Sequence, residues 1–178
     1  MKAAFLDRDG IINVDTGYVS RIEDFEFCPY IIELLNFLSD QRFALFICTN
    51  QSGLARGLFN DIAYENLTRS YLDDLNRSGI HITEIVTCPH HPEYTGICNC
   101  RKPLPGMFEY LISKYDIKVK SSIAIGDSIR DLEAANAVGI KRLFQVNDKN
   151  EIKNNKLGQS FASLGQLLQH LKLEAINA

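Results

Sequence analysis

The chain of 178 residues has few of the features that mark membrane, fibrous or nucleic-acid-binding proteins. It contains no apolar run of about 18 residues and no charged-then-apolar leader, so we expect neither a membrane-spanning helix nor secretion. Its five prolines and eleven glycines are too few for a linker or repeat of biased composition. Its net charge of -3 argues against a surface that binds nucleic acid. The sequence predicts a cytoplasmic protein that binds neither membranes nor nucleic acids.

The composition is that of an ordinary globular protein. Hydrophobic residues make up 46% of the chain and charged residues 23%. This length suffices to bury a core and fits one domain, residues 1–178, which we expect to be a monomer. The polar stretch 147–159 is the nearest thing to a linker, and we expect a surface loop there.

Short apolar runs alternate with segments in which apolar residues recur every three or four positions. The runs predict strands, and the spaced segments predict amphipathic helices, the first of which starts at Pro29. Strands that alternate with helices imply right-handed crossovers, so the sequence predicts an α/β fold with a doubly wound parallel sheet. The expected strands are 3–6, 42–48, 82–86, 122–126 and, as the last core strand, 141–146; the other expected helices are 61–76, 105–115, 131–137 and 164–173.

Two aspartates, Asp7 and Asp9, follow the first predicted strand, with Gly10 directly behind them. A buried strand over residues 3–6 delivers both to the carboxyl end of the sheet, and strand alternation sends them to the same side. Carboxylates this close repel when both are ionised, so they usually share a cation or divide the roles of nucleophile and proton donor. The alternative is an Asp-Gly turn without chemistry.

Polar residues also follow two later predicted strands, and a basic pair lies between them in the sequence. Thr49 and Asn50 follow the second strand, Lys102 precedes a proline, and Asp127 and Asp131 follow a fourth strand. The order Asp-x-Asp-Gly, Thr-Asn, Lys-Pro, Gly-Asp-x-x-x-Asp resembles that of the haloacid dehalogenase (HAD) superfamily of phosphatases. The resemblance implies the Rossmann-like HAD fold.

Members of this superfamily often carry a separate cap domain, inserted after the Asp-x-Asp loop or after the threonine-bearing strand. Between Gly10 and Thr49 the sequence has room for a loop, one helix and one strand only. Between Thr49 and Lys102 it has room for one helix, one strand and a loop. We therefore expect no cap domain and a site covered by loops.

Three cysteines and a histidine are crowded into a segment rich in Pro, Gly and His. They form two pairs, Cys88 with His90 and Cys98 with Cys100, separated by seven residues. Three thiolates and one imidazole make a closed tetrahedral set suited to Zn²⁺, so we expect a zinc-binding loop with a structural role. His91 is the alternative ligand, although the matching spacing of the two pairs favours His90. A chance cluster of thiols is the alternative to a metal site.

The position of this loop, just before Arg-Lys-Pro, resembles the branch that contains heptose-bisphosphate and histidinol-phosphate phosphatases. Residues 7–18, the Phe-Glu-Phe at 25–27 and residues 49–57 are most similar to the heptose enzymes. The resemblance implies a Mg²⁺-dependent phosphatase that removes the C7 phosphate of D-glycero-D-manno-heptose 1,7-bisphosphate during synthesis of surface polysaccharide. The alternatives are a histidinol-phosphate phosphatase, a DNA 3′-phosphatase, which the net acidity disfavours, and a catalytically inactive zinc-loop binding module.

The resemblance also implies roles for the aspartates. Asp7 would attack phosphorus, and Asp9 would protonate the leaving oxygen and later take a proton from water. The Mg²⁺ ligands would be a carboxylate oxygen of Asp7, the backbone carbonyl of Asp9 and the side chain of Asp127. Asp131 would orient Lys102 or the metal-bound waters, or would act only as a helix N-terminal carboxylate.

The resemblance assigns the remaining residues to phosphate and sugar. Lys102, the hydroxyl of Thr49 and the amide of Asn50 would hold the transferred phosphoryl group. Arg101 is the candidate for the second phosphate, with Arg56 a weaker one. Position 128 is serine where the heptose enzymes generally have a basic residue, so Ser128 would either weaken the binding of a bisphosphate or alter which anomer is preferred. The sugar would meet Asp15, Thr16, Gly17 and Tyr18 on one wall and Gln51 and Ser52 on the other.

Overall fold

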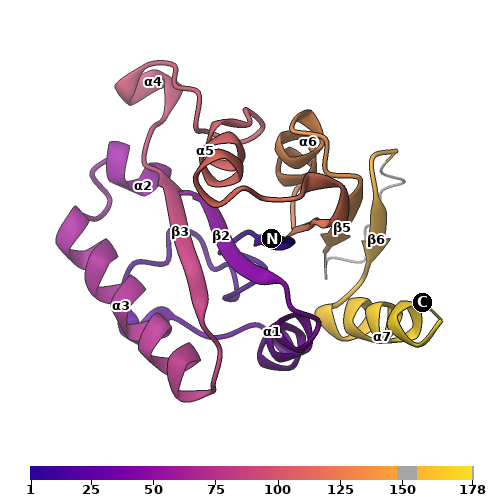
Figure 1. Cartoon of the computed structure of the whole chain (residues 1–178). Helices are drawn as coiled ribbons and strands as arrows, with labels where there is room; N and C mark the ends of the chain where they lie inside the picture. The colour runs from indigo at the N-terminus through magenta and orange to yellow at the C-terminus, as the bar shows by residue number, and fades with distance from the viewer. Residues whose placement is uncertain (148–155, 178) are drawn as a thin grey trace.

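A computed structural model describes residues 1–147 and 156–177. Its centre is a parallel sheet of six strands in the order β3-β2-β1-β4-β5-β6 (Figure 1). This order, with two halves that run outward from β1 and β4, is that of a doubly wound Rossmann-type fold. The strands are β1 (Ala3–Leu6), β2 (Ala44–Asn50), β3 (Ile82–Cys88), β4 (Ile123–Gly126), β5 (Arg142–Val146) and β6 (Gln159–Phe161).

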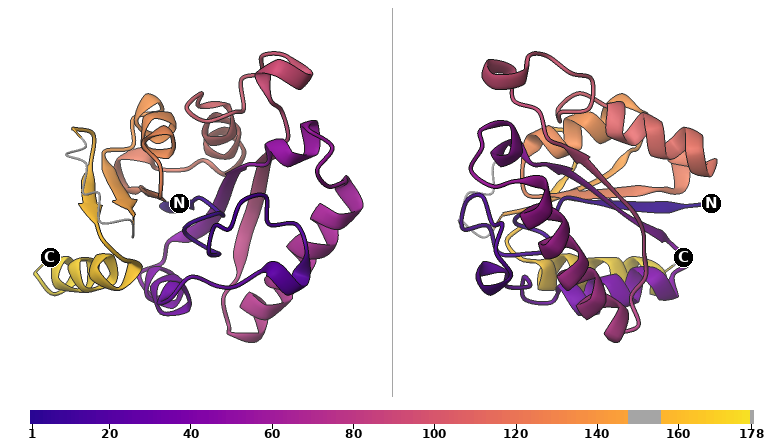
Figure 2. Two further views of the ribbon diagram at one scale, coloured as in Figure 1. Left: turned by 180° about the vertical axis from the view of Figure 1, so that it is seen from behind. Right: turned by 90° about the vertical axis from the view of Figure 1, so that its left-hand side faces the viewer.

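Helices cover both faces of the sheet. Figure 2 shows, in its right-hand view, longer helices on both sides of the sheet. One side has α5 (Gly106–Tyr115) and α6 (Ile129–Ala137), and the other has α1 (Ile31–Asp40), α3 (Asp61–Arg77) and α7 (Leu164–Ile176). The short elements are η1 (Ile22–Asp24), α2 (Ser52–Ala55), α4 (Pro92–Thr95) and η2 (Val119–Ser121).

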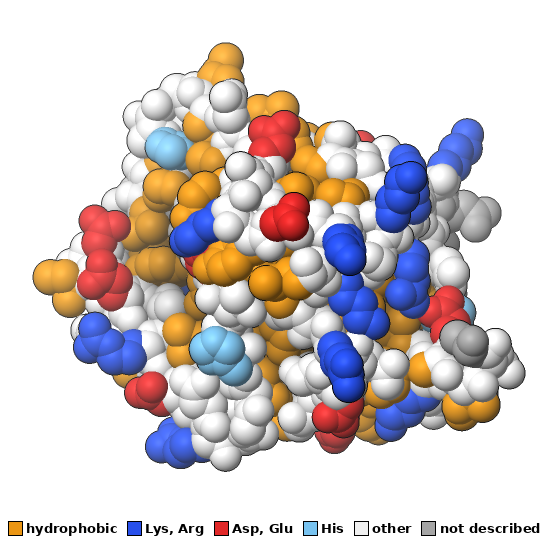
Figure 3. Space-filling model, viewed as in Figure 1, with side chains coloured by type: hydrophobic (Ala, Val, Ile, Leu, Met, Phe, Trp, Pro, Cys, Tyr) orange, Lys and Arg blue, Asp and Glu red, His pale blue; other side chains and the backbone are white. Residues whose placement is uncertain are grey.

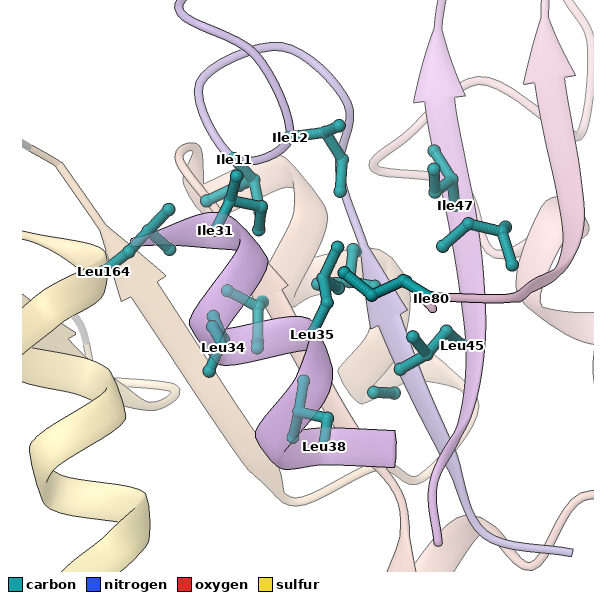
Figure 4. Close-up of a cluster of buried hydrophobic side chains, with 14 of the residues drawn as sticks. Ile11, Ile12, Ile31, Leu34, Leu35, Leu38, Leu45, Ile47, Ile80 and Leu164 are labelled. Carbon is teal, nitrogen blue, oxygen red and sulfur yellow. The ribbon is translucent and has the colours of Figure 1, made fainter. Parts of the chain in front are cut away.

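β1, β2, β4 and β5 are buried on both faces, which explains why their sequences are short continuous apolar runs. Ala4 and Leu6 of β1 join one buried cluster, whereas Ala3 and Phe5 join the other. In the first cluster, leucines and isoleucines of α1 pack against residues of β1 and β2 (Figure 4). β1 is packed between the two clusters, so the residues directly after Leu6 are attached to a firmly held strand.

The five predicted strands and five predicted helices are all present, with shifted ends. β2 continues to Asn50, so Thr49 and Asn50 belong to the strand and not to a loop after it. β5 is the last core strand, as predicted for residues 141–146, but a sixth strand that the sequence did not predict, β6, pairs with it in parallel. β6 has only three residues and is partly exposed at the edge of the sheet, so it lacks the apolar run from which a strand could be predicted. Most of the loop predicted at 147–159 lies outside the described residues.

The two connections that could carry a cap domain hold only small elements. Between β1 and β2 lie η1 and α1, and between β2 and Lys102 lie α2, α3, β3 and α4. Neither connection therefore holds a separate cap domain.

The surface shows a grouping of charge that the sequence order does not reveal. Figure 3 shows Lys and Arg side chains gathered in a band on the right half of one face. Folding thus forms a basic cluster that is not visible as a run in the sequence, and the absence of nucleic-acid binding stays a prediction. In the described part of the chain, no helix combines the length and the apolarity needed to cross a membrane.

Candidate active site

The site lies where the strand order of the sheet reverses. β1 and β4 are neighbours there, and the backbone N–H of Asp7 donates to the carbonyl of Ile125 at 3.0 Å. Open α/β sheets bind ligands beyond the carboxyl ends of their strands at such a switch point. A cavity of about 360 Å³ opens at this position. Its wall includes Asp7, Asp9, Asp15, Gly17, Tyr18, Asn50, Gln51, Ser52, Arg56, Arg101, Lys102, Asp127, Ser128, Arg130 and Asp131.

The side chain of Lys102 is buried at the base of this cavity and pairs with two carboxylates. Its Nζ atom lies 2.9 Å from Asp7 Oδ1 and 2.6 Å from Asp131 Oδ1, and it donates to the carbonyl of Cys48 at 2.6 Å. Burial opposes the charge of this lysine, but the two carboxylates outweigh burial and raise the pKa of Lys102 above its ordinary value. The lysine is therefore a fixed cation beside Asp7.

The carboxylates outnumber this cation. Burial, followed by the charge of Asp131, raises the pKa of Asp7 well above its ordinary value. The same two causes, in the same order, raise the pKa of Asp127 to about 7. Without a further cation, the cavity therefore favours protonated forms of both groups.

Because the carboxylates of the cavity outnumber the lysine, a divalent cation would be favoured there. Carboxylate oxygens of Asp7, Asp127 and Asp131 all lie within 4.8 Å of one another. Gly10 has φ +81°, and a Cβ atom there would lie 2.7 Å from Asp127 Oδ2, so glycine lets the loop approach this carboxylate. Hard oxygen ligands suit Mg²⁺.

Asp131 is occupied by partners other than a metal. One of its oxygens pairs with Lys102, and the other accepts from the backbone N–H of Ser128 at 3.0 Å. The Ser128 side chain in turn accepts from Arg130 N, which completes a capping box at the start of α6. Asp131 therefore contacts Lys102 and also caps α6. The contacts expected for a partner of Lys102 and for a helix N-terminal carboxylate are both present.

Asp9 lines the same cavity as Asp7, although not for the reason the sequence suggested. β1 ends at Leu6, and Asp9 lies beyond it in a bend that pairs with Asn13. Its carboxylate contacts Arg8, Asn13 and Gln51, not Lys102. Strand alternation therefore does not determine the direction of Asp9.

Two of the predicted residues lie away from the cavity wall. Thr49 is fully buried, and its hydroxyl accepts from Gln51 Nε2 at 2.8 Å. Thr16 is exposed on the loop whose other predicted members, Asp15, Gly17 and Tyr18, do line the cavity. The remaining residues predicted for catalysis, magnesium or substrate all contribute to the wall.

Arg130 is a wall residue that the sequence reasoning missed. Its Nε atom lies 3.3 Å from Ser128 Oγ, in the first turn of α6. A positive charge therefore reaches the region where Ser128 lacks one. The sequence could have indicated this residue, because Arg130 lies only two positions after Ser128 and both lie at the start of α6.

Arg101 and Arg56 occupy other parts of the wall. Arg101 donates to the carbonyl of His90 at 3.1 Å. The guanidinium of Arg56 lies 5.8 Å from the ring centre of Tyr18 and 2.9 Å, through Nη2, from His91 Nε2. His91 is thus engaged outside the cysteine cluster.

The cysteine cluster has the dimensions of a tetrahedral zinc site. Sγ of Cys98 lies 3.7 Å from that of Cys88 and 3.4 Å from that of Cys100. Nδ1 of His90 lies 3.7 Å from Cys88 Sγ and 3.3 Å from Cys100 Sγ. A tetrahedron with Zn–S bonds of about 2.3 Å has edges of about 3.8 Å, so these four atoms suit Zn²⁺. The prediction of His90 over His91 agrees with this grouping.

A buried lysine beside an aspartate at the reversal of a Rossmann-type sheet defines a hydrolase of the HAD class. A family model for HAD-hydrolase-like proteins matches residues 99–153. A D-glycero-alpha-D-manno-heptose-1,7-bisphosphate 7-phosphatase of Photorhabdus laumondii is 44% identical over 151 residues, which are 82% of each chain. A phosphatase of the same name from Campylobacter jejuni is 40% identical over 171 residues, 96% of each chain.

A solved structure agrees with these relatives. The crystal structure of the D,D-heptose 1,7-bisphosphate phosphatase of B. bronchiseptica, complexed with magnesium and phosphate, matches with a TM-score of 0.87 at 30% identity. The match covers 98% of this chain and 99% of that one. The chain therefore belongs to the heptose-1,7-bisphosphate 7-phosphatase family of HAD-like hydrolases. It is a phosphoric monoester hydrolase.

Proposed function

We propose that this enzyme removes the C7 phosphate of D-glycero-D-manno-heptose 1,7-bisphosphate, the substrate for which its relatives are named. The observation that carries the proposal is the distribution of positive charge around one cavity. Lys102 is buried, and Arg56, Arg101 and Arg130 line the same cavity. Several cations around one cavity suit a substrate with two phosphates.

The arginines support a bisphosphate because they are not neutralised. In the part of the chain that the structure describes, none of Arg56, Arg101 and Arg130 forms an ion pair with a carboxylate. A guanidinium binds a phosphate through paired hydrogen bonds, and Arg101 and Arg130 are our candidates for the non-transferred phosphate. The same charges disfavour histidinol phosphate, whose amino group and imidazole are cationic.

In this proposal, Asp7, which lines the cavity beside Lys102, is the residue that attacks phosphorus. Attack by a carboxylate oxygen forms an aspartyl phosphate and breaks the bond between phosphorus and the C7 oxygen. That oxygen takes a proton from Asp9, which then accepts one from the water that hydrolyses the intermediate. Water supplies the oxygen of the released phosphate, and Asp7 and Asp9 return to their starting states.

Lys102 and Asp131 would support this attack. The lysine offsets the charge of Asp7 and of the phosphoryl oxygens as they approach each other. Asp131 acts through Lys102, which it holds by the 2.6 Å ion pair. Mg²⁺, held by Asp7, Asp127 and the carbonyl of Asp9, would supply further positive charge to the phosphoryl group.

The cluster of Cys88, His90, Cys98 and Cys100 would bind Zn²⁺ as a structural ion. All four ligand positions come from the protein, so the ion has no open position for substrate. The cluster lies directly before Arg101 and Lys102 in the chain. It therefore fixes the backbone from which both cations reach the cavity.

The experiment that tests the proposal compares kcat/KM for several phosphates under one set of conditions. The panel consists of the α and β anomers of the heptose bisphosphate, histidinol phosphate and fructose 1,6-bisphosphate. We expect one or both heptose anomers to exceed the other substrates by at least about 100-fold. A higher value for histidinol phosphate would reject the proposal in favour of the alternative named above.

A further inference from the structure

Arg8, which lies between the two aspartates of the motif, is among the most buried charged residues of the molecule. Its side chain has 0% exposure. Burial of a guanidinium is costly unless it is paired and hydrogen-bonded. The partner of Arg8 is the carboxylate of Asp9, whose own side chain is 23% exposed toward the cavity. The pair thus joins a fully buried cation to a group that reaches the substrate.

The contacts of Arg8 fix the plane of the Asp9 carboxylate. Arg8 Nη2 donates to Asp9 Oδ1 at 2.8 Å, and Nε lies 3.2 Å from Oδ1 and 3.1 Å from Oδ2. Asn13 Nδ2 adds a bond to Oδ1 at 3.1 Å, and Gln51 Nε2 adds one to Oδ2 at 2.8 Å. Asn13 and Gln51 are themselves buried, at 0% and 4% exposure. Because the guanidinium fork is planar and rigid, it orients the carboxylate more strictly than a lysine would.

Arg8 also holds the loop that lines one wall of the cavity. Its Nη2 atom donates to the carbonyl of Val19 at 3.0 Å, directly after Tyr18. Its guanidinium lies 5.9 Å from the ring centre of Tyr64, and among residues 1–147 and 156–177 its Nη1 atom has no hydrogen-bond partner. A buried arginine with one unsatisfied nitrogen is a poor device for stability alone. The hydrogen bonds of its side chain are made with Asp9 and with the carbonyl of Val19, at the end of the loop that contains Tyr18.

From these contacts we propose that Arg8 is a positioning residue for proton transfer by Asp9. When Asp9 carries the proton, Arg8 holds its carboxyl group in the orientation from which the proton passes to the C7 oxygen, which leaves Asp9 as the carboxylate. Arg8 also sets the position of the loop that ends at Val19. This inference rests on the proposed function, in which Asp9 is the proton donor. The side chain of Arg8 does not line the cavity and acts through Asp9, whereas its backbone N–H donates to Asp7 Oδ1 at 2.7 Å and is unchanged by substitution of the side chain.

The test uses two substrates that differ in their need for a proton. The C7 oxygen of the heptose leaves as an alkoxide and requires one, whereas the phenolate of p-nitrophenyl phosphate is stable without one. In Arg8→Gln, kcat/KM for the heptose bisphosphate should fall about 100-fold or more, the usual scale for general acid catalysis. The value for p-nitrophenyl phosphate should fall less than about tenfold. Arg8→Lys, which keeps the charge but loses the fork, should be intermediate.

Asp9→Asn provides the reference for these measurements. It should show the same selective loss, and Arg8→Gln should add less than about threefold in the Asp9→Asn background, because both changes remove one function. Losses that multiply in the double variant, or equal losses on both substrates from Arg8→Gln, would overturn the inference. If Asp9→Asn itself loses activity equally on both substrates, the proposed role of Asp9 fails instead.

A variant that leaves Arg8 unchanged covers the case in which Arg8→Gln does not fold. Asn13→Ala removes a donor to Asp9 and to the carbonyl of Val14, but it leaves the bond from Arg8 to Val19 in place. We expect a loss of about three- to tenfold on the heptose bisphosphate and none on p-nitrophenyl phosphate. Equal losses on both substrates would contradict the orientation argument without any change at Arg8.

Discussion

The Nζ atom of Lys102 lies 2.9 Å from Oδ1 of Asp7. The carboxylate of Asp7 is the group that we propose attacks phosphorus. The two residues come from segments 95 positions apart (102 − 7) and meet because β1 and the segment after the cysteine cluster end at the same edge of the sheet. Asp131 holds the lysine from its other side. The cation is therefore set in place before any substrate arrives.

Replacement of this lysine should remove activity on every substrate. We expect Lys102→Met to lower kcat/KM by at least about 100-fold on mono- and bisphosphates alike, because a preorganised charge at the phosphoryl group is lost. It should also destabilise the fold, since Asp7 and Asp131 would remain buried without their partner. In Lys102→Met/Asp131→Asn, thermal unfolding should show recovered stability, whereas activity should stay lost. Activity that returns with stability would argue against a catalytic role.

Removal of one zinc ligand should release the metal and loosen the cavity wall. We expect about one zinc per chain in the purified protein and none in Cys98→Ser, by elemental analysis. The variant should have a lower Tm and a higher KM, because the cluster fixes the backbone before Arg101. Cys28→Ser, a change at a half-buried cysteine outside the cluster, is the control and should keep its zinc. A zinc content of zero in the unmodified protein would reject the site.

Asp127 should make the magnesium-free protein less stable as the pH rises. Burial and the charge of Asp131 raise the pKa of Asp127 to about 7, whereas an unfolded aspartate titrates near about 3.9. The folded state therefore binds the proton more tightly, and its advantage is lost between about pH 4 and pH 7. In magnesium-free buffer, Asp127→Asn should have the higher Tm at pH 8, by about 2 °C or more, and no advantage at pH 4.

Magnesium should reverse this order at pH 8, because it binds the ionised carboxylate of the unmodified protein but has less to bind in Asp127→Asn. The exposed Asp116 is the matched control, since Asn tolerates its left-handed backbone, with φ 47°, as well as Asp does. Asp116→Asn gives the change in Tm that follows from an Asp-to-Asn substitution outside the site. A difference in Tm between Asp127→Asn and Asp116→Asn that does not vary with pH would contradict the raised pKa of Asp127.

Arg101 should matter only for a substrate that carries a second phosphate. We expect Arg101→Ala to cost about 1.5 to 3 kcal/mol in kcat/KM for the bisphosphate, the usual scale for a charged hydrogen bond. A monophosphate of the same sugar should be almost unaffected. Ser128→Lys is the converse change and should strengthen bisphosphate binding if position 128 faces the distal phosphate. Equal losses on both substrates from Arg101→Ala would instead place this arginine at the transferred group.

The sequence was sufficient for the parts of the site that follow buried strands. Apolar runs located β1 and β4, and the residues after them, Asp7 and Asp127, had to meet once the sheet was parallel. The spacing of the Cys and His pairs likewise predicted the cluster around Cys98. These features depend on local patterns combined with one rule of topology.

Other features depend on side-chain directions that no local pattern encodes. Thr49 follows the predicted strand as expected, but its hydroxyl turns to Gln51 and not to the cavity. Asp9 turns to Arg8, because the chain bends after Leu6. Arg130 lines the cavity from the first turn of α6, which begins at Ile129. The predicted helix began at residue 131, two positions too late, and so did not include Arg130. The strand β6 was missed because three partly exposed residues carry no periodicity.

The position of the removed phosphate tests the central claim most directly. The heptose 1,7-bisphosphate would be incubated with the enzyme and Mg²⁺, and the products would be followed by ³¹P NMR. We predict that one equivalent of inorganic phosphate appears while the C7 resonance disappears and the C1 phosphate stays on the sugar. Loss of the C1 phosphate first, or loss of both at similar rates, would contradict the account.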